Sequence, residues 1–161
     1  MPVIHRSAIV PFSAESMYDL VNDIACYHEF VPYCTSSIVH EKNEDEIRAT
    51  LILSAKGIKK SFTTLNRLQK NRLMEIQLVD GPFKQLEGFW RFEDRDENHS
   101  EVILDLEFEL SNKIMAMMFG PVFQQVAGSL VDAFVVRAKE IYGGDACYEL
   151  TQSIRNKRSK L

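Results

Sequence analysis

The residues that could bind a metal or act as nucleophiles are few and scattered. The chain of 161 residues holds four histidines and three cysteines. Their closest grouping is Cys26 and His28 with Cys34, which offers three ligands where a structural zinc ion takes four. An odd number of cysteines without a tight pairing is typical of reduced thiols in a cytosolic protein. We therefore expect no metal site, and interpret the cysteines as small apolar core residues.

Paired carboxylates could support acid–base chemistry, and Asp105, Glu107 and Glu109 stand at alternate positions. Apolar residues alternate with them over 102–110, which is typical of a strand with one solvated face. The sequence contains no glycine-rich phosphate loop, no GxSxG elbow and no His-Glu-x-x-His zinc motif. It also shows no nucleophile paired with a base. We expect a protein that is not an enzyme.

Hydrophobic periodicity predicts the elements that position these residues. The first half of the pattern is a strand over 3–10, then a helix over 14–22 and a further turn over 24–29. Ser13 is the candidate N-cap of the helix, because a serine hydroxyl accepts from the free amides of the first turn. Pro32 ends the helical stretch, because the residue before a proline is disfavoured in the helical region.

The period changes to two between Cys34 and Leu110, where turn residues divide the chain into six strands. A long amphipathic helix follows over 113–142. Gly120-Pro121 lies inside this helix and predicts a kink or a split, because proline lacks the amide donor. Gly143-Gly144 predicts its C-cap.

The order of strand, helices, six strands and long helix predicts the α+β class. A curved antiparallel sheet of about seven strands needs a cover for its apolar face, and the long C-terminal helix supplies it. This helix-grip arrangement leaves a cavity between sheet and helix. We expect one domain over residues 1–144 and a basic, flexible tail over 145–161, where four basic residues outnumber two acidic ones.

Aromatic and methionine side chains are abundant at the positions expected to face inward. They indicate either a large, well-filled core or a pocket for an apolar ligand, to which flexible thioethers and flat rings adapt. The residues concerned are Phe30, Phe62, Trp90, Phe92, Phe108, Phe119, Phe123, Phe134, Met115, Met117 and Met118. The Gly120-Pro121 joint would lie at the mouth of such a pocket.

The net charge of −4 disfavours the uniformly basic surface that sequence-independent nucleic-acid binding requires. Lys56, Lys59 and Lys60 nevertheless gather around one turn. They form either a solvated turn or, with the basic tail, a contact for the phosphate groups of RNA or lipid. The sequence shows neither a signal peptide nor a stretch long enough to span a bilayer. We expect a cytoplasmic protein, with peripheral contact to the inner membrane as an alternative.

Four collinear motifs carry a resemblance to a known family. They are YHEFVPYC at 27–34, VDGPFKQLEGFWRF at 79–92, FELSN at 108–112 and VDAFVVRAKE at 131–140. The chain resembles the coenzyme Q-binding proteins and, most closely, the bacterial ribosome-association toxins of the START-like (polyketide cyclase/dehydrase-like) superfamily. The resemblance covers about residues 3–142 and implies a helix-grip fold with a hydrophobic tunnel.

The resemblance also implies two functions. The first is non-catalytic binding of ubiquinone or a lipid in the tunnel, in support of respiration, with no cofactor required. The alternative is binding to the large (50S) ribosomal subunit, which blocks subunit joining and inhibits translation, with a small antitoxin-like protein as a further partner. Lys56, Lys59 and Lys60 are the candidates for ribosome or phosphate contact.

The candidate ligand-binding residues follow from the inward positions and the resemblance together. They are Phe30, Pro32, Tyr33, Phe62, Trp90, Phe108, Met118, Phe119, Phe123 and Val126. Burial of an isoprenoid tail against them would contribute about 25 cal/mol per Å² removed from water. Tyr33, Thr64 and Arg137 are equal candidates for the polar group that orients a quinone head.

Overall fold

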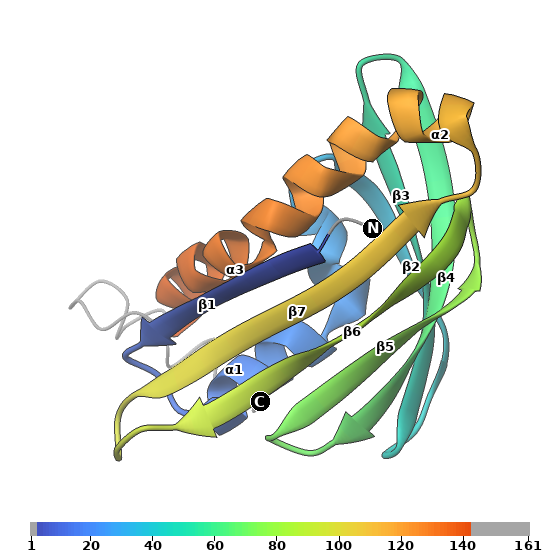
Figure 1. Cartoon of the computed structure of the whole chain (residues 1–161). Helices are drawn as coiled ribbons and strands as arrows, with labels where there is room; N and C mark the ends of the chain where they lie inside the picture. The colour runs from blue at the N-terminus through green and yellow to red at the C-terminus, as the bar shows by residue number, and fades with distance from the viewer. Residues whose placement is uncertain (1–2, 143–161) are drawn as a thin grey trace.

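The structure of the chain is a computed structural model that describes residues 3–142 (Figure 1). Its elements in chain order are β1 (Val3–Val10), α1 (Ala14–Asn22), the 3₁₀ helix η1 (Ile24–Glu29), β2 (Cys34–Lys42), β3 (Glu46–Ala55), β4 (Ile58–Gln69), β5 (Leu73–Asp80), β6 (Phe83–Asp94), β7 (Ser100–Leu110), α2 (Lys113–Met118) and α3 (Gly120–Tyr142). The predicted helices, the first strand and the six following strands are all present. The predicted C-cap at Gly143-Gly144 and the tail over 145–161 lie outside the described residues.

The seven strands form one antiparallel sheet in the order β1-β7-β6-β5-β4-β3-β2. The N-terminal strand therefore pairs with the last strand, while β2 to β7 follow one another as a meander. Figure 1 shows the sheet curving around α3, which lies along β1 and β7. The α+β helix-grip prediction is confirmed.

The sheet turns use residues that accept a positive φ. Lys56 and Gly57 have φ of 55° and 80°, and Ala55 pairs directly with Ile58. Two central residues of positive φ form a type I′ turn, whose twist matches that of the strands. This confirms the turn that the Lys-Gly pair predicts between β3 and β4.

Side-chain caps begin both α1 and α2, and the first of them is the predicted Ser13 cap. The Ser13 hydroxyl accepts from the Ser16 amide at 3.1 Å and begins α1. Asn112 Oδ1 accepts from the Met115 amide at 2.8 Å and begins α2. The predicted long helix is split into α2 and α3 at Phe119, so Pro121 lies in the first turn of α3. Amides in the first turn of a helix have no helical acceptor, so a proline there costs no hydrogen bond.

The core lies between the concave face of the sheet and the apolar stripe of α3. Along β7, the apolar residues that alternate from Val102 to Leu110 are buried, and Asp105, Glu107 and Glu109 face the other side. Phe123 and Phe134 on α3 are buried, as is Phe119 at the junction of α2 and α3. Burial of one such side chain stabilises the fold by about 1.5–3 kcal/mol. The stripe therefore holds α3 against the sheet.

Candidate ligand-binding cavity

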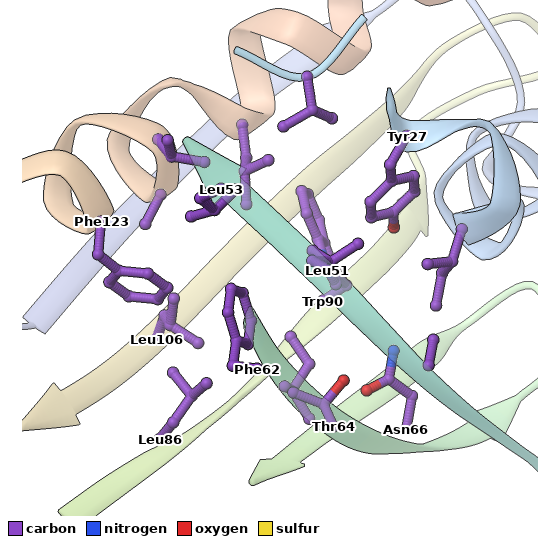
Figure 2. Close-up of a pocket in the computed structure, with 17 residues that line it drawn as sticks. Tyr27, Leu51, Leu53, Phe62, Thr64, Asn66, Leu86, Trp90, Leu106 and Phe123 are labelled. Carbon is purple, nitrogen blue, oxygen red and sulfur yellow. The ribbon is translucent and has the colours of Figure 1, made fainter. Parts of the chain in front are cut away.

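A cavity of about 80 Å³ remains between the sheet, η1 and α3 (Figure 2). We call it the central cavity. Its lining comprises Ile24, Tyr27 and Val31 around η1, Ala49, Leu51, Leu53, Phe62, Thr64, Asn66, Ile76, Leu86, Trp90 and Leu106 of the sheet, and Phe123, Val126, Ala127 and Leu130 of α3. The walls are almost entirely apolar.

Strand periodicity explains how the sheet lines the cavity. Residues two apart in a strand point to the same face, so Ala49, Leu51 and Leu53 of β3 share the concave face. Phe62, Thr64 and Asn66 do the same on β4. Because β3 and β4 are consecutive neighbours, these two rows form one continuous wall.

The polar groups of the wall gather at one end. Figure 2 shows Thr64 and Asn66 side by side there, whereas Leu86, Leu106 and Phe123 lie at the other end. The third polar group, the Tyr27 hydroxyl, is already used because it donates to the Val21 carbonyl. Burial raises the pKa of Tyr27 well above its usual range, so this phenol stays protonated at neutral pH.

Four of the ten candidate ligand-binding residues belong to this lining. They are Phe62, Trp90, Phe123 and Val126. Thr64, one of the three candidates for orienting a polar head group, lines it too. The inward period of strand and helix predicts their position on this wall.

Phe108 and Phe119 lie outside the lining, which corrects their expected position. Phe108 packs against Phe123 with ring centroids 4.7 Å apart, and Phe119 packs against Phe83 at 6.2 Å. Both side chains are buried. The aromatic rings at this end fill the space between sheet and helix. They form part of a well-filled core, which was one of the two interpretations of the aromatic positions in the sequence.

Phe30, Pro32 and Arg137 also lie away from the central cavity. They line a shallow surface hollow between the end of η1 and α3. There the Arg137 guanidinium lies 5.0 Å from the centre of the Phe30 ring and binds the Glu29 carboxylate at 2.6 Å. Arg137 thus joins η1 to α3 at this hollow and does not line the central cavity.

Tyr33 and Met118 are exposed, which corrects their expected place in the wall. Tyr33 has a φ of 62° in the turn that leads into β2, and its hydroxyl lies 3.4 Å from Gln125 Nε2 at the surface. Met118 belongs to α2, none of whose residues is fully buried, and its side chain is exposed. Its neighbour Met117 is 73% exposed.

The three lysines of the candidate phosphate contact surround the β3–β4 turn. Lys56 and Lys59 are exposed and Lys60 is half-buried. Strand alternation turns Lys59 and Lys60 to opposite faces of β4, so they do not form one flat patch. None of the three makes an ion pair with another residue in 3–142.

The cysteines of the described region are free and shielded. Burial, with a hydrogen bond and negative charge from Asp23, raises the pKa of the Cys26 thiol to about 11, and burial raises the pKa of Cys34.

His28 contacts the Ser37 hydroxyl at 3.0 Å. Among residues 3–142, no group of three His, Cys, Asp or Glu side chains could hold a metal ion. No helix in the same range is long and apolar enough to cross a bilayer.

The candidates drawn from the sequence include no residue of the β3 wall, and neither Tyr27 nor Asn66. The alternation of Ala49, Leu51 and Leu53 is a signal for the wall, but these side chains are aliphatic, whereas the predicted pocket depended on aromatic and methionine positions. Asn66 had a signal too, since it is a polar residue at an inward position of an otherwise apolar strand face. Tyr27 is placed by the turn of η1, which periodicity over six residues does not define.

A seven-stranded antiparallel sheet that grips a long C-terminal helix over an apolar cavity defines a START-like helix-grip protein. The chain belongs to the polyketide cyclase/dehydrase and lipid transport family, whose model matches residues 10–135. The resemblance noted from the four sequence motifs is therefore confirmed.

The chain is similar both to proteins named as toxins and to a protein named as coenzyme Q-binding. The ribosome association toxin RatA of Escherichia coli (strain K12) is 45% identical over 142 residues, covering 88% of this chain and 90% of the relative. The mitochondrial coenzyme Q-binding protein coq10 of Schizosaccharomyces pombe is 26% identical, with coverage of 83% and 84%. A START superfamily protein from Mycobacterium smegmatis has the same fold, with a TM-score of 0.70 at 17% identity over 85% of this chain and 97% of the other.

Proposed function

We propose that the protein binds an apolar small molecule, such as ubiquinone or another isoprenoid lipid, in the central cavity without transforming it. The observation that carries this proposal is an interior cavity with apolar walls from both sheet and helix. A well-packed core leaves few voids larger than a water molecule. A space of about 80 Å³ with polar groups at one end therefore supports a binding site for a small molecule.

The size of the cavity sets a condition on binding. Small-molecule pockets usually measure roughly 300–1,000 Å³, and the central cavity measures about 80 Å³. A quinone ring with its tail must therefore displace α3 or the β3–β4 hairpin outward. The name of the coq10 relative, a coenzyme Q-binding protein, supports ubiquinone as the ligand. A role in support of respiration is part of the same proposal.

A non-catalytic role fits the chemistry of the lining. Of the 17 residues drawn around the cavity, Tyr27 alone is titratable, and its hydroxyl is engaged with Val21. An aldol cyclisation or dehydration needs a group that takes up or delivers a proton near neutral pH. The raised pKa of Tyr27 removes it from that range.

Organic extraction of purified protein followed by mass spectrometry tests this proposal. Trp90 is the one tryptophan of the chain and lines the cavity, so added short-chain ubiquinone should quench its fluorescence. Ala127→Leu fills the cavity and should abolish the quenching, while the control Ala116→Leu adds the same bulk at an exposed site of α2. If no quinone or lipid is extracted and added quinone leaves Trp90 unchanged, the proposal fails.

Association with the large ribosomal subunit is the second candidate function. It is favoured by the 45% identity to a relative named ribosome association toxin. Lys56, Lys59 and Lys60 are cations without ion-pair partners in the described part of the chain, and they could contact the phosphates of ribosomal RNA. This surface lies outside the cavity, so both functions are compatible in one molecule.

Co-sedimentation with purified large subunits tests the second function. Binding should weaken as salt rises, because each lysine–phosphate contact releases a counterion. Lys59→Glu/Lys60→Glu should reduce binding, whereas Lys70→Glu, in the turn just after the opposite end of β4, should not. Failure to sediment with the subunit at low salt would exclude this function.

A further inference from the structure

One buried polar atom in the wall of the central cavity lacks a partner. Asn66 is 5% exposed, and its Oδ1 makes no hydrogen bond to any residue in 3–142. Its Nδ2 lies 3.7 Å from the Met74 sulfur on the adjacent strand β5. Buried polar atoms are nearly always hydrogen-bonded, so an orphan beside a cavity indicates a missing partner inside that cavity.

The chemistry of Met74 fixes which atom of the amide faces the cavity. A thioether sulfur accepts hydrogen bonds and cannot donate them. The amino group of Asn66 is therefore the end that faces Met74, which is itself fully buried. The free atom is the carbonyl oxygen, a pure acceptor, so its missing partner must be a donor.

Thr64 provides a second polar group beside this oxygen. It precedes Asn66 by two residues on β4 and shares the inward face. Figure 2 shows the two side chains adjacent at the same end of the cavity, and Thr64 makes no side-chain hydrogen bond within the described chain. A hydroxyl can donate and accept at once. Asn66 and Thr64 together therefore match a group that also does both.

We infer that the cavity selects an apolar molecule whose buried end is a hydroxyl group, which donates to Asn66 Oδ1 and pairs with Thr64 Oγ1. This rests on the proposed function and adds the position and chemistry of the polar end. Prenyl alcohols, long-chain alcohols and hydroquinones carry such a donor. Oxidised ubiquinone carries only acceptors, so of its two redox forms the hydroquinone is the one that can donate to Asn66 Oδ1 in this orientation.

The volume of the cavity agrees with a slender end group. An engineered cavity of roughly 150 Å³ in another protein takes up benzene, and the central cavity has about half of that volume. A hydroxyl on a linear chain fits with less displacement of the walls than a substituted ring. The remaining chain extends toward Leu86, Leu106 and Phe123 at the apolar end.

A pair of isomers separates donor recognition from hydrophobic binding. 1-Decanol and 1-methoxynonane have the same formula and similar apolar surface, but only the alcohol can donate. Titration of the full chain, followed by Trp90 fluorescence and calorimetry, should give a Kd at least about tenfold lower for the alcohol. Asn66→Leu keeps the size of the side chain and removes the acceptor, so it should bring the two Kd values together.

Matched variants keep the test independent of folding defects. Thr64→Val should reduce the preference for the alcohol in part, while Thr63→Val, on the opposite face of β4, should leave it unchanged. If Asn66→Leu does not fold, the wild-type preference together with Thr64→Val still decides the matter. Equal Kd values in the wild type would overturn this inference and leave apolar binding intact. Binding of neither isomer, with no lipid extracted, would overturn both.

Discussion

The indole ring of Trp90 meets the ring of Phe134 edge to face, with ring centroids 5.3 Å apart and planes at 88°. Trp90 comes from β6 and lines the central cavity, and Phe134 comes from the middle of α3 and is fully buried. Edge-to-face contact joins the positive rim of one ring to the negative face of the other. The pair thus joins α3 to β6 next to the central cavity. The fluorescence of Trp90 should therefore report both ligand binding and the packing of α3 on the sheet.

Phe134→Ala should cost about 3–5 kcal/mol of unfolding free energy, because it leaves a large void. Phe134 also packs against Tyr27 and Phe30, with centroids 5.2 and 5.1 Å away, so η1 would lose its support as well. Chemical denaturation followed by circular dichroism measures the change. Val136→Ala, at an exposed site of the same helix, should shift it by less than about 0.5 kcal/mol. Equal effects would contradict the assigned role of Phe134.

Gly88→Ala should destabilise the sheet, because β6 and β7 approach too closely there for a side chain. A Cβ at Gly88 would lie 2.1 Å from the Asp105 carbonyl oxygen, well inside contact distance. Gly128→Ala, in the interior of α3, should instead stabilise by about 0.5–1 kcal/mol, because alanine favours helix and meets only the movable end of Arg6. The melting temperature should therefore fall below that of the wild type in Gly88→Ala and rise above it in Gly128→Ala.

Ser100→Ala should leave stability unchanged or raise it by about 1 kcal/mol. Ser100 is fully buried, and its hydroxyl has no hydrogen-bond partner among residues 3–142, so alanine removes an unpaired polar group. Ser13→Ala provides the contrast, because it removes the N-cap of α1 and should cost about 0.5–2 kcal/mol. Urea denaturation measures the free energy of unfolding of both variants. A large loss of stability in Ser100→Ala would contradict the absence of a hydrogen-bond partner for this hydroxyl.

Alkylation of Cys26 should keep accelerating with pH beyond the range of an ordinary thiol. The thiolate is the reactive form, and burial beside Asp23 raises the pKa of Cys26 to about 11. Because unfolding returns this thiol to its ordinary, lower pKa, stability should also fall as pH rises through the interval between the two values. Iodoacetamide kinetics on Cys34→Ala/Cys147→Ser, which keeps Cys26 alone, measure the profile. A plateau near pH 9, as for N-acetylcysteine, would contradict the shift.

The sequence by itself determined the local elements, because each depends on residues close together in the chain. The period of two over 102–110 required a strand with one buried face, and Ser13 supplied the cap where the first helix begins. The same periods placed Phe62, Trp90, Phe123 and Val126 inward. Pattern alone thus predicted the fold class and part of the cavity wall.

Tertiary structure decided which inward residues enclose space and which fill it. Phe108 and Trp90 share the inward face of neighbouring strands, yet Phe108 meets the ring of Phe123 while Trp90 borders the cavity. That difference depends on how far α3 stands from the curved sheet at each point, a distance between segments remote in sequence. The unpaired oxygen of Asn66 follows from the same cause, because only the assembled fold shows which polar atoms are left without a partner.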